Sequence, residues 1–299
     1  MRHCLDKRQE RVQQTILRWY RKQGRHFLPW RKTTDLYKIA VSEVMLQQTN
    51  VPKVISRYSD FLMVFPSWDV LAKTRFAMVL RKWQGLGYNR RALYLHRASQ
   101  SIVKNYGGKL PDDEEALKKL SGFGPYTRAA ISVFGRNKDC VARDVNIDRV
   151  LRRVQGKKSI SERTAQKLAE KFLPRGKSRD WHNALMDLGA TICTKRAPQC
   201  AVCPISSLCL SFPDPRDYIS LIKKEPGRRE HGKHIPRRIY RGRIVEVLRS
   251  KRATLQTLGR NIKKDWHSKN DKVWLVEILQ KLASEGMIEY KKGRWQLKA

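Results

Sequence analysis

Residues 120–130 read Leu-Ser-Gly-Phe-Gly-Pro-Tyr-Thr-Arg-Ala-Ala, and this stretch decides the fold. Gly122 and Gly124 flank Phe123 in a predicted tight turn. Pro125 suits the first position of the following helix, where its missing N–H is not needed. The pattern predicts a helix–hairpin–helix whose turn exposes backbone N–H groups that can bind a phosphate. An ordinary helix–helix turn explains the same residues, so the turn alone does not decide a function.

Two acids stand where catalytic carboxylates could lie. Asp144 directly precedes the helical run 145–150, and the dipole of that helix favours its ionised form. Glu43 lies in the middle of another predicted helix, next to Met45 and Leu46. Burial there would raise its pKa and keep a proton available. A surface position for Glu43 and a purely capping role for Asp144 are the plainer alternatives.

The charge of the chain points to a polyanionic partner. The 299 residues carry a formal net charge of +37, and 40% of them are hydrophobic, enough for a packed core. Nucleic acid is the first choice of partner. A ribosomal or chromatin structural protein is the alternative, but the basic residues are spread among apolar-periodic segments. With no membrane-spanning run and no signal peptide in the sequence, we expect a soluble, cytoplasmic, nucleoid-associated protein.

Hydrophobic periodicity predicts an all-α region followed by a small second domain. Helices are expected at residues 8–22, 36–48, 54–65, 68–72, 76–83, 90–106, 113–120, 161–173 and 180–193, with Asn50 and Asp112 as caps and no strand before residue 285. Three further helices, at 242–249, 254–262 and 272–284, precede a basic hairpin that turns at residues 291–293.

The predicted domains are residues 1–211, a basic, proline-containing linker at 212–239, and residues 240–299. Three helices and a basic hairpin are the pattern of a winged helix. A small basic α+β appendage that reads no DNA groove is the alternative.

The cysteines predict a metal centre. Four of the six lie within 17 residues at the spacing C-x6-C-x2-C-x5-C: Cys193, Cys200, Cys203 and Cys209. Clustered thiols in a cytosolic chain favour metal over disulfides. Only Cys200 and Cys203 have the short spacing of a zinc knuckle, and four thiolates around a larger object suit a [4Fe–4S] cluster. Zinc and free structural cysteines are the alternatives, and the spacing does not show a redox role.

These motifs together resemble the helix–hairpin–helix DNA glycosylases of the endonuclease III superfamily. Three further stretches resemble its MutY-type adenine DNA glycosylases: Leu-Pro-Trp-Arg at 28–31, Ser-Glu-Val-Met-Leu-Gln-Gln-Thr at 42–49 and Gly-Leu-Gly-Tyr at 85–88. The resemblance covers residues 8–210. It implies an all-α, two-lobed helix–hairpin–helix fold with an iron–sulfur loop at 193–209, and the winged-helix-like α+β domain would follow it. Double-stranded DNA and a flipped base would bind between the lobes.

The resemblance also assigns roles to residues. Glu43 would protonate adenine at N7, and Asp144 would stabilise the cationic sugar. Tyr126 and Asn146 would lie against these carboxylates, with Arg31 near the base. The base pocket and DNA contacts would come from Leu46, Gln48, Tyr88, Gly122 and Gly124, with Gln48 and Tyr88 filling the space that the flipped base leaves.

Two departures from the family pattern are visible. Val145 stands where the family usually has glycine, and the basic tail does not resemble the Nudix-like domain that reads oxidised guanine in typical members. Tyr126 occupies the position at which strand-cleaving relatives carry a lysine, so we expect a monofunctional glycosylase. We also expect the protein to be a monomer. Its predicted substrate is adenine opposite 8-oxoguanine or guanine. A mismatch thymine or uracil glycosylase and a non-catalytic DNA-binding regulator are the alternatives.

Overall fold

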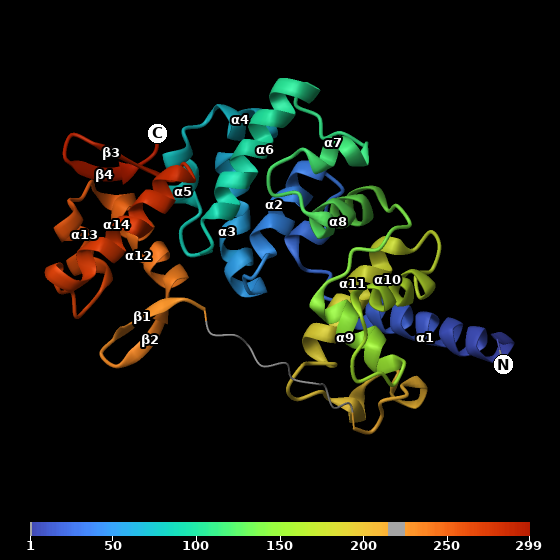
Figure 1. Ribbon diagram of the computed structural model, residues 1–299. Helices are drawn as coiled ribbons and strands as arrows, with labels where there is room; N and C mark the ends of the chain where they lie inside the picture. The colour runs from blue at the N-terminus through green and yellow to red at the C-terminus, as the bar shows by residue number, and fades with distance from the viewer. Residues whose placement is uncertain (1, 215–224) are drawn as a thin grey trace. The chain divides into compact units, whose positions relative to one another are not determined.

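The computed structural model describes residues 2–214 and 225–299 and is almost entirely helical there (Figure 1). The chain forms two compact units. The first unit consists of Met1–Glu43 and Phe123–Leu221, and the second of Val44–Gly122 and Ile222–Ala299. The chain passes from one unit to the other inside a helix, at Glu43–Val44, and inside the predicted hairpin, at Gly122–Phe123. Both segments that the sequence singles out therefore contribute residues to both units.

The first unit is a helical bundle. Its elements are α1 (Arg2–Gln23), η1 (Pro29–Arg31), most of α2 (Leu36–Leu46), α8 (Pro125–Arg136), α9 (Val145–Val154), α10 (Glu162–Lys171), α11 (Ser178–Thr191), η2 (Cys200–Val202) and η3 (Ser206–Leu208). Helix α11 packs against α1 and α9. Buried apolar residues at helical spacing form this core, including Ile16, Ile147, Leu151, Trp181 and Leu188.

The second unit joins a helical lobe to the C-terminal part of the chain. The lobe contains α3 (Val51–Val64), α4 (Trp68–Lys73), α5 (Phe76–Lys82), α6 (Arg90–Tyr106) and α7 (Glu114–Lys118). The C-terminal part contains β1 (Gly227–Glu230), β2 (Lys233–Pro236), α12 (Arg237–Ser250), α13 (Leu255–Ile262), α14 (Ser268–Ser284), β3 (Ile288–Lys291) and β4 (Arg294–Leu297). Helix α12 packs against α5, which ties the two parts of this unit together.

Local capping signals explain where several helices begin and end. The Asn50 side chain accepts a hydrogen bond of 3.3 Å from the backbone N–H of Lys53, as expected of an N-cap. Helix α6 has the predicted bounds and ends at Gly107, whose φ of 59° lies in the left-handed region that glycine favours. These boundaries are predictable because the capping residue and the turn lie next to each other in the sequence.

Several predicted helix ends differ from the observed ones: α1 begins at Arg2 rather than residue 8, α3 at Val51 rather than residue 54, and α11 at Ser178 rather than residue 180. Two further differences have a clear local cause. Asp113, not Asp112, caps α7, because its backbone is extended and its side chain accepts from the Ala116 N–H at 2.7 Å. Helix α2 ends at Leu46 rather than Gln48, because the backbone of Gln48 turns to a φ of 55°. Gln48 therefore stands on a turn instead of in the last turn of a helix.

The segment from α7 to α8 is the predicted helix–hairpin–helix. Gly122 has a φ of 81°, and a Cβ there would lie 2.7 Å from Cβ of Tyr94, so only glycine fits this turn. Gly124 is the N-cap of α8, and Pro125 occupies the first turn of the helix as predicted. The first N–H groups of α8 thus follow a turn whose one large side chain, Phe123, is buried.

One strand pair was not expected from the sequence. β1 and β2 form an antiparallel hairpin with Arg228 opposite Ile235, and the chain turns at His231 and Gly232, both with positive φ. The expectation of no strand before residue 285 is therefore wrong, because the highly charged residues hide a tight turn that ends in glycine. The hairpin lies inside the segment assigned to a linker, of which residues 215–224 lie outside the described residues. The proposed domain boundaries stay a prediction.

The last three helices and the final hairpin occur in the predicted order, although α12 begins at Arg237 rather than residue 242 and α14 at Ser268 rather than residue 272. Thr254 caps α13 by accepting from the Thr257 N–H at 3.2 Å. β3 and β4 pair antiparallel, and Lys292 and Gly293 make the turn with φ values of 50° and 74°. Three helices followed by a basic hairpin give this small region the order of elements of a winged helix. In the described part of the chain, no helix combines the length and the apolar character needed to cross a bilayer.

Candidate active site

Glu43 is a buried acid held by one hydrogen bond. It lies on α2 with 5% of its surface exposed, and the hydroxyl of Tyr126 donates to its Oε2 at 2.9 Å. Tyr126 lies in the first turn of α8, so the hairpin determines its position. Burial raises the pKa of Glu43 to about 7, although the hydrogen bond from Tyr126 lowers it. The raised pKa agrees with the expectation from the apolar neighbours of Glu43.

Asp144 is the N-cap of α9. Its Oδ1 accepts from the backbone N–H groups of Asn146 and Ile147 at 2.9 and 2.8 Å, and its Oδ2 accepts from Nδ2 of Asn146 at 2.7 Å. Burial raises the pKa of Asp144, while the hydrogen bonds from Ile147 and Asn146 oppose the shift. The sequence alone suggested only the stabilising effect of the helix N-terminus, because partial burial of the carboxyl group is not visible in the sequence.

A second set of contacts holds Asn146. Arg149 donates from Nη2 to Oδ1 of Asn146 at 2.8 Å and to the carbonyl of Gly189 at 2.6 Å. Its Nε donates to the carbonyl of Cys193 at 2.8 Å. A Cβ on Gly189 would lie 2.6 Å from Cβ of Asn146, so α9 and α11 approach closely at this glycine. Asn146 is thus fixed from three sides.

Arg31 forms a buried ion pair. Its Nη1 and Nη2 donate to Asp187 at 2.6 and 2.8 Å, and Arg25 donates to the same carboxylate through its backbone N–H and Nε. Asp187 is 1% exposed, and Arg31 holds its pKa below the usual range despite burial. Asp187 therefore belongs to the interior of the first unit, and Arg31 is oriented by this pair.

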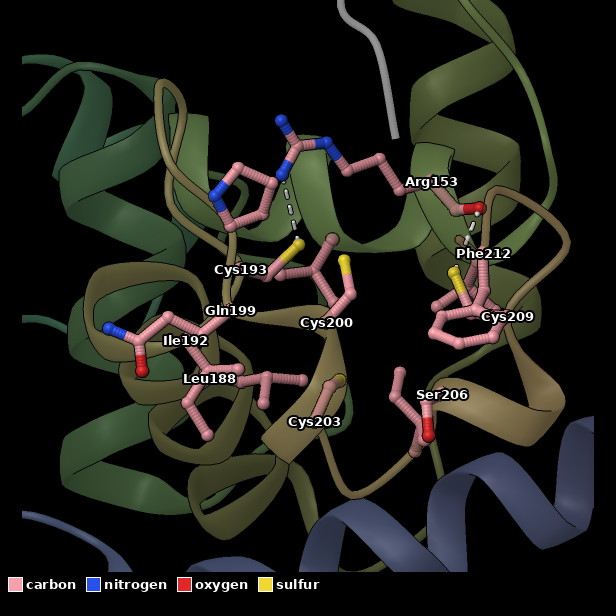
Figure 2. Close-up of a pocket in the computed structure, with 14 residues that line it drawn as sticks. Arg153, Leu188, Ile192, Cys193, Gln199, Cys200, Cys203, Ser206, Cys209 and Phe212 are labelled. Carbon is pink, nitrogen blue, oxygen red and sulfur yellow. Dashed lines mark hydrogen bonds between the residues drawn. The ribbon is translucent and has the colours of Figure 1, made fainter. Parts of the chain in front are cut away.

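The four clustered cysteines line a single, largely apolar pocket in the first unit. The other lining residues include Val150, Val154, Leu188, Ile192, Ile205 and Phe212. Figure 2 shows the cysteine side chains around this pocket, with Arg153 above Cys193. Arg153 donates to Sγ of Cys193 at 3.3 Å, and its carbonyl accepts from the thiol of Cys209 at 3.4 Å. Burial raises the pKa of Cys203 to about 11, so burial by itself favours the neutral thiol there.

The four sulfur atoms surround a space instead of meeting at one point. Among residues 2–214 and 225–299, no three Cys, His, Asp or Glu side chains meet in an arrangement ready for one metal ion. Four thiols around a shared apolar volume fit an iron–sulfur cluster, which four cysteines can hold. Arg153 supplies a positive charge beside the thiolates that such a group requires.

The second unit contains Leu46, Gln48, Tyr88 and Gly122 of the predicted site residues, whereas Gly124 belongs to the first unit. Leu46 ends α2, and the exposed Gln48 and Tyr88 both have positive φ, at 55° and 44°. Tyr88 is 45% exposed. A left-handed backbone at a residue other than glycine costs about 1–3 kcal/mol and persists only where the surroundings fix it. These two turns are therefore held in place by other residues.

Arg91 holds both turns, although no motif in the sequence pointed to it. Its guanidinium donates to the carbonyls of Val44, Met45 and Gln47 at 2.5–2.8 Å and to those of Leu86 and Gly87 at 3.0 and 3.1 Å. It also lies 5.6 Å from the ring centroid of Tyr88. Arg91 shares the apolar face of α6 with Leu95, Ala98 and Ile102. A charged residue on an apolar helix face is the one feature of the sequence that could have predicted its buried role.

Comparison with known proteins identifies the family. Residues 41–175 match the HhH-GPD superfamily of base excision DNA repair proteins. The adenine DNA glycosylase of Mycobacterium tuberculosis is 35% identical over 246 residues, which cover 79% of this chain and 77% of that protein. The adenine DNA glycosylase of Buchnera aphidicola subsp. Baizongia pistaciae is 37% identical over 202 residues, 67% of this chain. The chain spans 58% of the length of that relative.

A solved structure gives the same fold. The structure of a thermostable thymine-DNA glycosylase is 31% identical, with a TM-score of 0.65, over 69% of this chain and 96% of that chain. Nearly the whole of that protein therefore has a counterpart in this chain. From the hairpin, the relatives and this fold, we conclude that the chain belongs to the HhH-GPD superfamily of base excision DNA repair proteins, and within it to the MutY-type DNA glycosylases.

Proposed function

We propose that the chain is a monofunctional DNA N-glycosylase that removes adenine mispaired with 8-oxoguanine or guanine. One observation carries the proposal: a buried carboxyl group with a pKa near 7, Glu43, lies in the same unit as a second, hydrogen-bonded carboxyl group, Asp144. Two carboxyl groups with different surroundings are what cleavage of a glycosidic bond requires. The relatives named adenine DNA glycosylase supply the choice of base.

Glu43 is suited to be the general acid. When the bond between sugar and base breaks, the electron pair stays on the base, and a proton delivered to adenine N7 makes it a neutral leaving group. A group with a pKa of about 7 is protonated in a substantial fraction of molecules at neutral pH and still gives up its proton readily. Tyr126 holds the carboxyl group in one orientation.

Asp144 is suited to stabilise the positive charge that develops on the sugar. Its two oxygens are fixed by Asn146 and Ile147, so the negative charge needs no rearrangement during the reaction. The same geometry would allow a transient covalent bond between the carboxylate and the sugar. Because the hairpin presents Tyr126 and no lysine, we propose base removal with little strand cleavage.

Double-stranded DNA is the proposed partner. The net charge of +37 supplies attraction to phosphates, and the N–H groups that follow Gly122 and Gly124 suit one phosphate of the backbone. A base inside a duplex must be extruded before it reacts. Gln48 and Tyr88 are proposed to fill the vacated space, with Leu46 and Arg31 near the extruded base.

A [4Fe–4S] cluster is the proposed cofactor of residues 193–209. Cys193, Cys200, Cys203 and Cys209 would hold it, and their shared pocket next to Arg153 fits such a group. When bound, it would tie the loop together and shape a basic surface at Lys195 and Arg196. We further propose a cytoplasmic, nucleoid-associated monomer with domains at residues 1–211 and 240–299.

A mismatch thymine glycosylase is the second candidate, favoured by the 31% identity to the thymine-DNA glycosylase structure over 96% of that chain. Single-turnover base release from duplexes with A:8-oxoG, A:G, T:G and U:G pairs separates the two. We expect adenine release from the first two duplexes, with thymine a poor substrate. Glu43→Gln serves as the control that lacks the acid. Faster release of thymine than of adenine would show that the chain is a mismatch thymine glycosylase instead.

A further inference from the structure

The segment from Gln84 to Arg90 carries Tyr88 in a strained loop. Gly85, Gly87 and Tyr88 all have positive φ, and Tyr88 is exposed. On the inner side, Arg91 fixes the carbonyl groups of this loop. On the proposed function the ring of Tyr88 enters the DNA stack, so the ends of this loop must also be held in place.

The C-terminal domain, proposed above as residues 240–299, supplies that support at the end of the loop. Arg249 on α12 donates from Nη2 to Oδ1 of Asn89 at 3.0 Å and from Nε to the carbonyl of Leu80 at 3.1 Å. Asn89 is the N-cap of α6, yet its side chain makes no capping bond. Its oxygen accepts from the C-terminal domain instead, and the side chain of Arg249 is only 9% exposed.

Two more contacts hold the loop at both ends. Gln84, at its start, donates to Glu246, one turn before Arg249 on α12. Arg90, at its end, donates to Glu285, which lies just beyond α14. Arg97 on α6 donates to the carbonyl of Glu285 at 2.9 Å, so the anchor of Arg90 is itself fixed to the lobe.

We propose that the C-terminal domain is a positioning element for Tyr88: Arg249, Glu246 and Glu285 clamp both ends of residues 84–90 and so set how the ring enters the DNA stack. The proposal rests on the proposed glycosylase function. It gives the small domain a role within base extrusion in addition to any contact of its own with DNA. Arg249 acts through Asn89 and touches no reacting atom.

The clamp predicts a specific kinetic defect. Without it, the loop can relax from the left-handed conformation at Tyr88, and the base is extruded more slowly. The chemical step on a base that is already extruded should be unchanged, because Glu43 and Asp144 are in the other unit. This separation distinguishes a positioning residue from a residue that merely keeps the protein folded.

The test compares Asn89→Ala, Arg249→Ala and the double variant in the full chain. The probe is a duplex with an A:8-oxoG pair and 2-aminopurine beside the adenine, whose fluorescence rises on unstacking. We expect each single variant to slow both the rise and the release of adenine by about tenfold, with no further loss in the double variant. Arg260→Ala, which removes an exposed charge from α13, should match the wild type.

A second duplex, in which the target adenine is unpaired in a bulge, should restore wild-type rates to all three variants. Slow release from the bulge, or additive losses in the double variant, would overturn the clamp. Asn89→Ala keeps the result interpretable if Arg249→Ala unfolds the domain, because Asn89 contributes no cap to α6. If the wild type releases no adenine, the proposed function is wrong. The rise of fluorescence on DNA binding, compared between wild type and variants, would still test the clamp.

Discussion

The hydroxyl of Tyr126 lies 2.9 Å from Oε2 of Glu43 and donates to it, which joins the first turn of α8 to the acid on α2. This hydrogen bond lowers the pKa of Glu43, whereas burial raises it. Tyr126→Phe removes the donor, so the pKa of Glu43 should rise further above about 7. The falling, alkaline limb of the single-turnover rate against pH should move to higher pH. An unmoved alkaline limb would mean that another group limits the rate there.

Glu43 should also make stability depend on pH. Its pKa is about 7 in the folded protein against an ordinary 4.5, so the folded state binds the proton more tightly. This acid therefore costs nothing below pH 4.5, and its cost grows until the pH passes about 7, where it reaches on the order of 3 kcal/mol. Glu43→Gln should be more stable than the wild type above pH 7. Chemical denaturation at pH 5 and pH 8 measures the difference, which should shrink towards zero at the lower pH.

Asp144→Asn removes a negative charge and keeps the shape of the side chain. We expect adenine release to fall at least about a hundredfold, the scale of losing one preorganised electrostatic partner. Duplex affinity should survive. The matched control is Asp148→Asn on the same helix, whose carboxylate pairs with Arg143. Equal rates of adenine release for Asp144→Asn and wild type would show that Asp144 takes no part in the reaction.

Anaerobically purified protein should be brown and contain about four irons per chain, since four thiols share one pocket. Cys200→Ser should lose iron and duplex affinity together. Cys140→Ser is the control, because Cys140 lies outside that pocket. Metal analysis that finds one zinc and no iron would contradict the cluster.

The wing between β3 and β4 should contribute to the salt dependence of binding. Lys291, Lys292 and Arg294 are exposed there. Replacing them by Ala, Asn and Ala should flatten the plot of log affinity against log salt by roughly 0.9 for each phosphate that the wing no longer neutralises. Asparagine is chosen at position 292 because it tolerates the left-handed backbone. Lys291→Arg keeps the charge and should leave the slope as it is.

Short-range signals made much of the fold predictable. Local residues determine three of these features: the turn at Gly122, the cap at Asn50 and the turn at Lys292 and Gly293. Each could therefore be predicted from a short stretch of sequence. Arg91 was missed because its importance comes from carbonyl groups more than forty positions away in the sequence. The short spacing of a turn is readable in a sequence, whereas the partner of a buried cation is known only once the chain has folded.

The Glu43 site shows the same division. Apolar neighbours on α2 were enough to predict a raised pKa, but its hydrogen bond with Tyr126 came from the resemblance alone, because 83 residues separate the two. No motif in the sequence marks Asp187 as the partner of Arg31. Its burial under Arg25 and Arg31 depends on three segments that meet only in the folded unit.

Gly189 is a position at which no larger residue fits without moving Asn146. Any side chain there would meet Cβ of Asn146 at 2.6 Å and its Cα at 3.2 Å, and Asn146 is a direct support of Asp144. A missense change at this codon would therefore shift the carboxylate of Asp144 and leave the residues proposed to bind the DNA backbone and to fill the stack unaltered. A gene carrying it would still encode a protein that finds its target and fails to cut the bond, which leaves the lesion both occupied and unrepaired.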